Sequence, residues 1–97
     1  MKTMIETNIH ALYRAISVIE SDREAQLFFE DLCTPSELDS MADRWAAVQA
    51  LKSGKAYRKI HEDTGVSVTT VGRVSRCISY GNGGYDLIFE RIQRNEK

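Results

Sequence analysis

The stretch GVSVTTVGR at residues 65–73 decides the fold of this chain. Its centre, residues 68–71, is a run of four β-branched side chains, whose intrinsic preference is for a strand. The preceding YRKIHEDT at 57–64 has a helical pattern. Ser67 can cap a helix that starts at 68, and apolar residues then recur at helical spacing at Val71, at Val74 or Ser75, and at Ile78. Because tertiary packing often overrides propensity, we predict a helix here.

Two short helices joined by a tight turn containing glycine make a helix-turn-helix. We expect this motif over residues 56–79, with a first helix from Ala56 to Thr64 that buries Ile60. Gly65 would make the turn, Val66 would pack inward, and Gly81 would stop the second helix. In such a motif the first turn of the second helix enters the major groove of DNA. The alternative is a helical hairpin that binds no ligand.

The residues that the motif would present to DNA form two groups. Basic side chains near the first helix suit phosphates, whereas hydroxyls, methyl groups and an arginine on the second helix can meet base edges. We expect Lys55, Arg58 and Lys59 on phosphates, Ser67 at the helix cap, Val68, Thr69, Thr70 and Arg73 at the bases, and Arg76 on the DNA backbone.

Upstream of the motif, residues 1–33 predict two helices that serve dimerisation. The first carries an apolar stripe stepping by four and three, which also suits a seam between chains. That stripe consists of Ile5, Ile9, Leu12, Ile16 and Ile19. The second helix is capped by Ser21 or Asp22. Its apolar side consists of Leu27, Phe28, Phe29 and Leu32.

A long helix over residues 35–53 has a clear start signal in TPSE at 34–37. Thr34 is a natural cap, Pro35 suits the first helical position, and Glu37 completes a capping box. Gly54 ends this helix. The apolar face consists of Leu38, Met41, Trp45, Val48 and Leu51. Trp45 on this face is expected to be core.

A last helix over 84–95, begun by Tyr85 or Asp86, is expected to bury Leu87, Ile88 and Ile92. The prediction is therefore an all-α chain of about six helices, without a strand. It forms a single domain over residues 1–97.

Composition excludes several classes of protein. The chain has 97 residues, 42% of them hydrophobic and 28% charged, with no apolar run long enough to cross a membrane. Its N-terminus carries polar residues throughout and is unlike a signal peptide, so the cytoplasm is the expected location. The two cysteines, Cys33 and Cys77, form no CxxC and predict no metal site. No catalytic constellation is present, so we expect no enzyme.

The charge is polarised along the chain although the net charge is only −1. Residues 20–43 hold eight acids and one arginine, whereas residues 52–80 hold six bases and two acids. A basic segment on an acidic body suits a phosphate backbone as partner. The alternative is that both segments are solvated helix faces.

Three segments together resemble the Trp repressor superfamily, and most closely its branch of small proteins of the YerC/YecD type. They are LCTPSELDSMADRW at 32–45, LKSGKAYRKIHEDTGVSVTTVGRVSR at 51–76 and YGNGGYD at 80–86, about half of the chain. The resemblance implies an all-helical fold whose N-terminal helices interlock with a second chain in a two-fold dimer. Such a dimer presents two recognition helices about one DNA turn apart, so palindromic sites are expected.

The resemblance also implies a pocket for a tryptophan corepressor. Thr34, Arg44, Thr70 and Arg73 match the family's threonines and arginines there. Two positions depart from the pattern, because Val74 replaces a small glycine beside the indole and Cys77 replaces a serine. We therefore expect no cofactor, and a small-molecule effector, if present, other than tryptophan.

The functional prediction is a homodimeric, sequence-specific DNA-binding regulator, repressor-like, with double-stranded DNA as partner and no membrane. The alternative is a helical dimer that binds a protein partner through the acidic segment 20–43 and binds no DNA.

Overall fold

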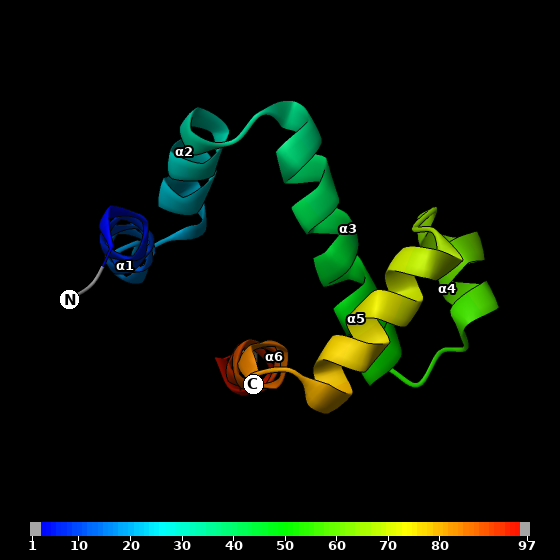
Figure 1. Ribbon diagram of the computed structural model, residues 1–97. Helices are drawn as coiled ribbons and strands as arrows, with labels where there is room; N and C mark the ends of the chain where they lie inside the picture. The colour runs from blue at the N-terminus through cyan, green and yellow to red at the C-terminus, as the bar shows by residue number, and fades with distance from the viewer. Residues whose placement is uncertain (1–2, 96–97) are drawn as a thin grey trace. The chain divides into compact units, whose positions relative to one another are not determined.

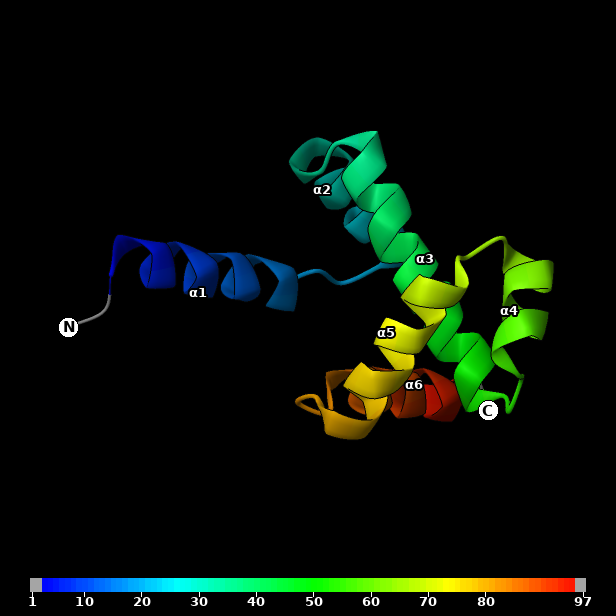
Figure 2. The same ribbon diagram turned by 45° about the vertical axis from the view of Figure 1, so that its right-hand side comes forward.

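The computed structural model describes residues 3–95, and this range contains six α-helices and no strand (Figure 1 and Figure 2). The all-α prediction is thereby confirmed. The chain divides into two compact parts, with the boundary inside α3 between Leu38 and Asp39. The helices are α1 (Met4–Ser17), α2 (Asp22–Leu32), α3 (Pro35–Lys52), α4 (Tyr57–Thr64), α5 (Val68–Tyr80) and α6 (Gly84–Asn95).

Side-chain caps start the first two helices. Thr3 and Glu6 form a capping box at α1, which the sequence analysis missed. Ser21, one of the two expected caps of α2, accepts a hydrogen bond from the amide of Glu24. The expected stripe on α1 was one residue too long, because the helix ends at Ser17 and Ile19 lies beyond it.

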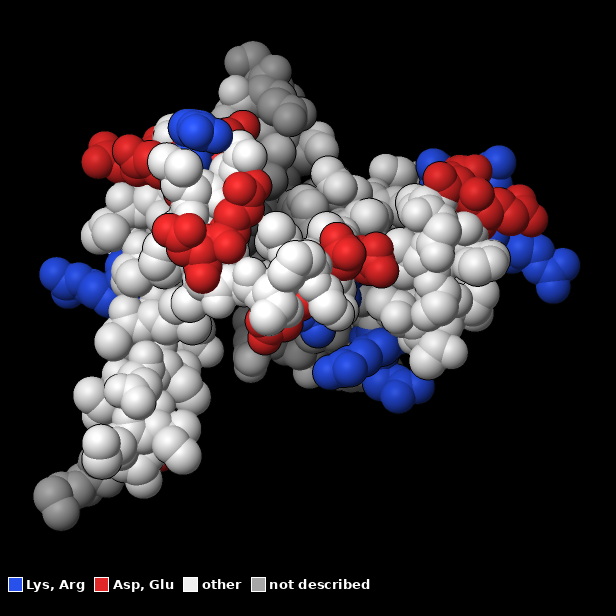
Figure 3. All heavy atoms as spheres, turned by 90° about the horizontal axis from the view of Figure 1, so that it is seen from above, with Lys and Arg blue, Asp and Glu red and all other residues white. Residues whose placement is uncertain are grey.

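The first part of the chain has no core of its own. Neither α1 nor α2 contains a buried residue. Large apolar side chains on both helices are instead exposed, whereas acidic residues gather over α2 (Figure 3). The exposed apolar residues there are Met4, Ile5, Ile9, Tyr13, Leu27 and Leu32, with Val18 just after α1.

Helix α3 starts at Pro35, as the sequence predicts, and ends at Lys52, one residue before the predicted end. The amide of Glu37 donates to the Thr34 hydroxyl at 3.1 Å, and the amide of Thr34 donates to the Glu37 carboxylate at 2.9 Å. This reciprocal pair is a complete capping box. At the other end Gly54 adopts φ 85°, a left-handed conformation that glycine reaches without strain.

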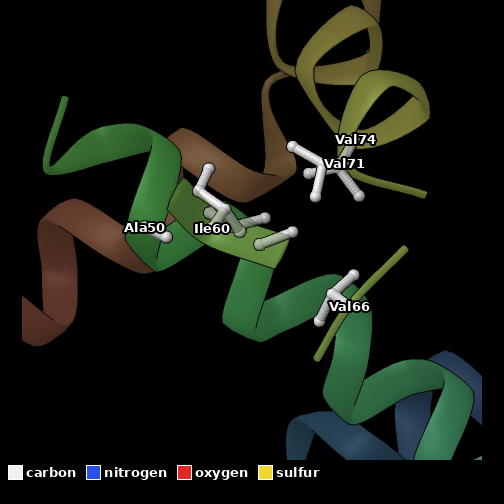
Figure 4. Close-up of a cluster of buried hydrophobic side chains, with 7 residues drawn as sticks. Ala50, Ile60, Val66, Val71 and Val74 are labelled. Atoms are coloured by element: carbon white, nitrogen blue, oxygen red, sulfur yellow. The ribbon is translucent and has the colours of Figure 1, made fainter. Parts of the chain in front are cut away.

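One small core holds α3, α4 and α5 together in the second part. It consists of Ala47, Val48, Ala50, Ile60, Val66, Val71 and Val74. Figure 4 shows side chains from the three helices and from the turn before α5 gathered at this junction. Partly buried residues pack around it: Trp45, Ala46, Leu51, Ile78 and Tyr85.

The buried face of α3 differs in part from the expected stripe. Val48 is buried as predicted, but so are Ala47 and Ala50, whereas Trp45 is only partly buried. Both alanines belong to the same buried cluster as Val48, so the buried face of α3 is wider than the expected stripe. A stripe read from the large apolar residues alone does not anticipate that small residues beside it are buried as well.

The predicted inner face of α6 is wrong. Leu87, Ile88 and Ile92 are 38–49% exposed, whereas Tyr85 packs against the core. Lys52 pairs with Asp86 at 2.8 Å, and its ammonium lies 5.8 Å from the ring centroid of Phe89. These contacts turn one apolar side of α6 toward α3 and leave its other apolar residues exposed.

Of the helices in the described range, none combines the length and the apolarity that crossing a bilayer requires.

Replacing Ile60 with alanine should lower the free energy of unfolding by about 2–5 kcal/mol, because Ile60 is fully buried at the junction of three helices. Urea denaturation followed by circular dichroism, at one protein concentration, measures this loss. Val68→Ala is the control, because Val68 is 49% exposed, and should change stability by less than about 0.5 kcal/mol. Equal losses in the two variants would contradict this assignment of the core.

Candidate nucleic-acid interface

Three hydrogen bonds close the turn between α4 and α5. Gly65 caps α4 with φ 79°, and its amide donates to the His61 carbonyl at 2.9 Å. The Thr64 hydroxyl donates to the Ile60 carbonyl at 2.7 Å and accepts from the Val66 amide at 3.1 Å. These bonds satisfy the last carbonyls of α4 while the chain reverses.

His61 adds a contact that the sequence analysis missed. Its Nδ1 lies 2.9 Å from the carbonyl oxygen of Val66. Because a carbonyl only accepts, Nδ1 carries the proton in this contact. The Val66 side chain is 2% exposed, as predicted. His61 is exposed at the surface and also braces the turn through this contact.

Ser67 starts α5 and resolves the conflict between strand propensity and helical spacing. Its hydroxyl accepts from the Thr70 amide at 3.1 Å and donates to the Thr70 hydroxyl at 3.0 Å. The cap satisfies a backbone donor that a helix start otherwise leaves open. The β-branched run is thus helical, as predicted.

The two sides of α5 have different roles. Val71 and Val74 are buried against α3 and α4, which selects Val74 over Ser75 as the inward residue. Thr69, Arg73 and Arg76 are exposed, and their spacing of four and three places them along one helix face. Val68 is also exposed at the tip of α5, whereas Thr70 is half-buried. The outward face therefore combines two small β-branched residues with two arginines.

Two of the three expected phosphate-binding side chains are already paired. Lys55 Nζ lies 3.0 Å from one oxygen of Asp63, and Lys59 Nζ lies 3.1 Å from the other. Arg58 forms no ion pair with any residue in 3–95. Figure 3 shows the consequence at the α4 end of the view, where basic and acidic groups are interleaved. The basic segment is less one-sided than its sequence suggests.

The electrostatics of this cluster favour the ionised carboxylate. Hydrogen bonds from Lys55 and then Lys59 lower the pKa of the Asp63 carboxyl. The stabilisation that these bonds provide is present above the ordinary pKa of an aspartate, and it is lost as the pH falls through the lowered value.

Arg44 and Arg73 both line two pockets in the second part of the chain. The larger, of about 320 Å³, is mostly apolar. Its lining consists of Met41, Arg44, Trp45, Arg73, Val74, Cys77 and Tyr85. The smaller, of about 190 Å³, is more polar. It is lined by Ser40, Asp43, Arg44, Thr70 and Arg73.

The pockets bring together five of the six residues expected around an effector. Arg44, Thr70, Arg73, Val74 and Cys77 each line at least one of them. Thr34 lines neither and serves as the cap of α3. Sequence reasoning missed Met41 and Tyr85, because nothing local to either residue marks it as a pocket wall.

Among residues 3–95, no group of three or more histidine, cysteine or acidic side chains is positioned to hold a metal ion. Cys33 and Cys77 are both free thiols.

A family model described as Trp repressor protein matches residues 7–93 of this chain. The uncharacterized protein YerC of Bacillus subtilis (strain 168) is 38% identical over 85 residues, which cover 88% of this chain and 82% of the relative.

Two solved structures have closely similar folds. A TrpR-like protein from Eubacterium eligens ATCC 27750 has a TM-score of 0.84 and 39% identity, covering 90% of each chain. A candidate Trp repressor from Staphylococcus aureus has a TM-score of 0.85 and 32% identity, covering 95% of this chain and 96% of that one.

We expect the carboxyl of Asp63 to titrate below the ordinary aspartate value of about 3.9, because two ammonium groups donate to it. Carbon-detected NMR across an acid titration measures this pKa. Lys55→Met should raise it toward the ordinary value. The matched control, Lys52→Met, removes the partner of Asp86 instead and should leave Asp63 unchanged. An unshifted Asp63 in the unmodified protein would show that the cluster does not persist in solution.

Proposed function

We infer the function from the family: the chain belongs to the Trp repressor family, a family of DNA-binding regulators and not of enzymes. Within it we propose that this protein is a homodimeric, sequence-specific, repressor-like transcriptional regulator. The observation that carries the proposal is the helix-turn-helix, in which a capped α5 exposes its first turn while its inner face is buried. That is the arrangement by which such a motif reaches the major groove.

Contacts to the DNA backbone would come mainly from α4 and its approach. Arg58 has no ion pair to give up before it contacts a phosphate. Lys55 and Lys59 would contact a phosphate either in place of Asp63 or in addition to it. Arg76 would reach the backbone from α5. Base contacts would come from Val68, Thr69, Thr70 and Arg73, with Ser67 holding the start of the helix.

The exposed apolar residues of α1, α2 and α6 support a homodimer. Surfaces of this kind usually mark an interface, and helices without a buried residue need a partner to stabilise them. We propose that a second copy covers them in an interlocked, two-fold arrangement. Two copies also double the phosphate contacts, which compensates for a net charge of −1 per chain.

The pocket beside Arg73 is a candidate effector site, and tryptophan fits it poorly. Val74 lines it where the family pattern has a small glycine, and Cys77 lines it where the pattern has a serine. A compact anion held by Arg44 and Arg73 is the alternative ligand, since neither arginine has an ion-pair partner among the described residues.

Selection from a randomised duplex pool at two salt concentrations tests the proposed function. We expect a palindromic sequence to be enriched, and fluorescence anisotropy to show its affinity falling steeply as salt rises. The acidic surface over α2 favours a second candidate, a module that binds a protein partner without DNA. No enrichment at either salt, together with capture of one protein partner, would favour that second function.

Arg58→Ala should weaken binding to specific and random duplexes alike, and should lower the salt slope by about one unit per protomer. The reason is that Arg58 would contact phosphate, which carries no sequence information. Anisotropy titrations over a range of salt measure the slope. Arg23→Ala, which removes the same charge from α2, is the matched control and should leave the slope unchanged. A loss of affinity confined to the specific duplex would indicate that Arg58 contacts bases and not phosphates.

Ile9→Glu should convert the dimer to a monomer, because it places a charge on the exposed apolar stripe of α1. Analytical ultracentrifugation should give twice the chain mass of 11.0 kDa for the unmodified protein and the chain mass for the variant. Asn8→Glu adds the same charge to the neighbouring position and should leave the dimer intact. If both variants remained dimeric, the interface would lie elsewhere.

A further inference from the structure

The tip of α5 carries an apolar side chain that the rest of the chain covers only in part. Val68 is 49% exposed, although the nearby Val66, Val71 and Val74 are at most 2% exposed. Thr69, the next residue, is exposed as well. An apolar side chain this open at a helix start contributes little to the core. Its exposed surface is available for contact with a partner outside this chain.

The polar groups beside the tip are engaged elsewhere. The Ser67 hydroxyl is hydrogen-bonded to both the amide and the hydroxyl of Thr70. Thr70 is half-buried and lines the smaller pocket with Arg73. The surface that α5 presents first is therefore the two methyl groups of Val68 and the methyl and hydroxyl of Thr69.

In the major groove only thymine offers a methyl group, at C5, and apolar side chains recognise it by contact. Building on the function proposed above, we propose that α5 identifies its DNA sites by contacts of Val68 and Thr69 with thymine methyl groups. Under this proposal, apolar contact supplies the base recognition at the tip of α5. Arg73, which also lines both pockets, contributes separately.

Replacement of thymine by uracil tests this inference directly, since it removes only the methyl group and keeps every base-pair hydrogen bond. The duplex enriched in the selection is synthesised with uracil in place of each thymine in turn, and its affinity is measured by anisotropy. We expect a loss of about fourfold for each contacted methyl, the value of one buried methyl group.

Protein variants assign the methyl contacts to residues. Val68→Ala and Thr69→Ser should each reduce the thymine-to-uracil affinity ratio toward one. Thr69→Val, which keeps a methyl but loses the hydroxyl, should preserve the ratio. Tyr80→Ala is the control, because Tyr80 is 86% exposed at the far end of α5, and it should leave the ratio unchanged.

The outcomes separate this inference from the function on which it rests. Failure to enrich any duplex would overturn both. An enriched duplex that binds equally well with uracil at every thymine would overturn the methyl recognition alone, as would an enriched duplex without thymine in its half-sites. A ratio that stays unchanged in Val68→Ala and Thr69→Ser would show that other residues read the methyl groups.

Discussion

Val66, in the turn between α4 and α5, is held by its backbone amide, its carbonyl and its side chain. Its amide donates to the Thr64 hydroxyl, its carbonyl accepts from His61 Nδ1, and its side chain is buried in the core. A residue held in this way fixes the direction in which the chain leaves α4. The position of Ser67, and with it the start of α5, follows from that direction. The inward side of α5 then packs on Ile60, and the outward side is left exposed.

Features that depend on a few neighbouring residues were predictable from the sequence. The capping box of Thr34 and Glu37, the Ser67 cap and the left-handed glycines at 54 and 65 are all in place. Each of them is a backbone requirement satisfied within four residues. This explains why a run with strand propensity could be assigned to a helix: its cap and its apolar spacing were both local and agreed.

Features that depend on distant residues were not predictable in the same way. The side of α6 that faces the core is decided by Lys52 and Trp45 on α3, so the expectation for Leu87, Ile88 and Ile92 was wrong. The pairing of Lys59 with Asp63 is predictable, because residues four apart on a helix lie side by side. The pairing of Lys55 with Asp63 is not, because Lys55 lies before the start of α4. Most of the expected pocket residues do meet, whereas its aromatic wall at Tyr85 comes from a helix that spacing alone does not place.

The core of the helix-turn-helix contains no large flexible side chain. Among residues 3–95, every buried residue other than two alanines is a valine or an isoleucine. In a helix these side chains occupy essentially one rotamer, so they have no alternative packing into which they can relax. The tip of α5, with Val68 and Thr69, is therefore anchored on a core whose side chains hold it in one position relative to α3 and α4.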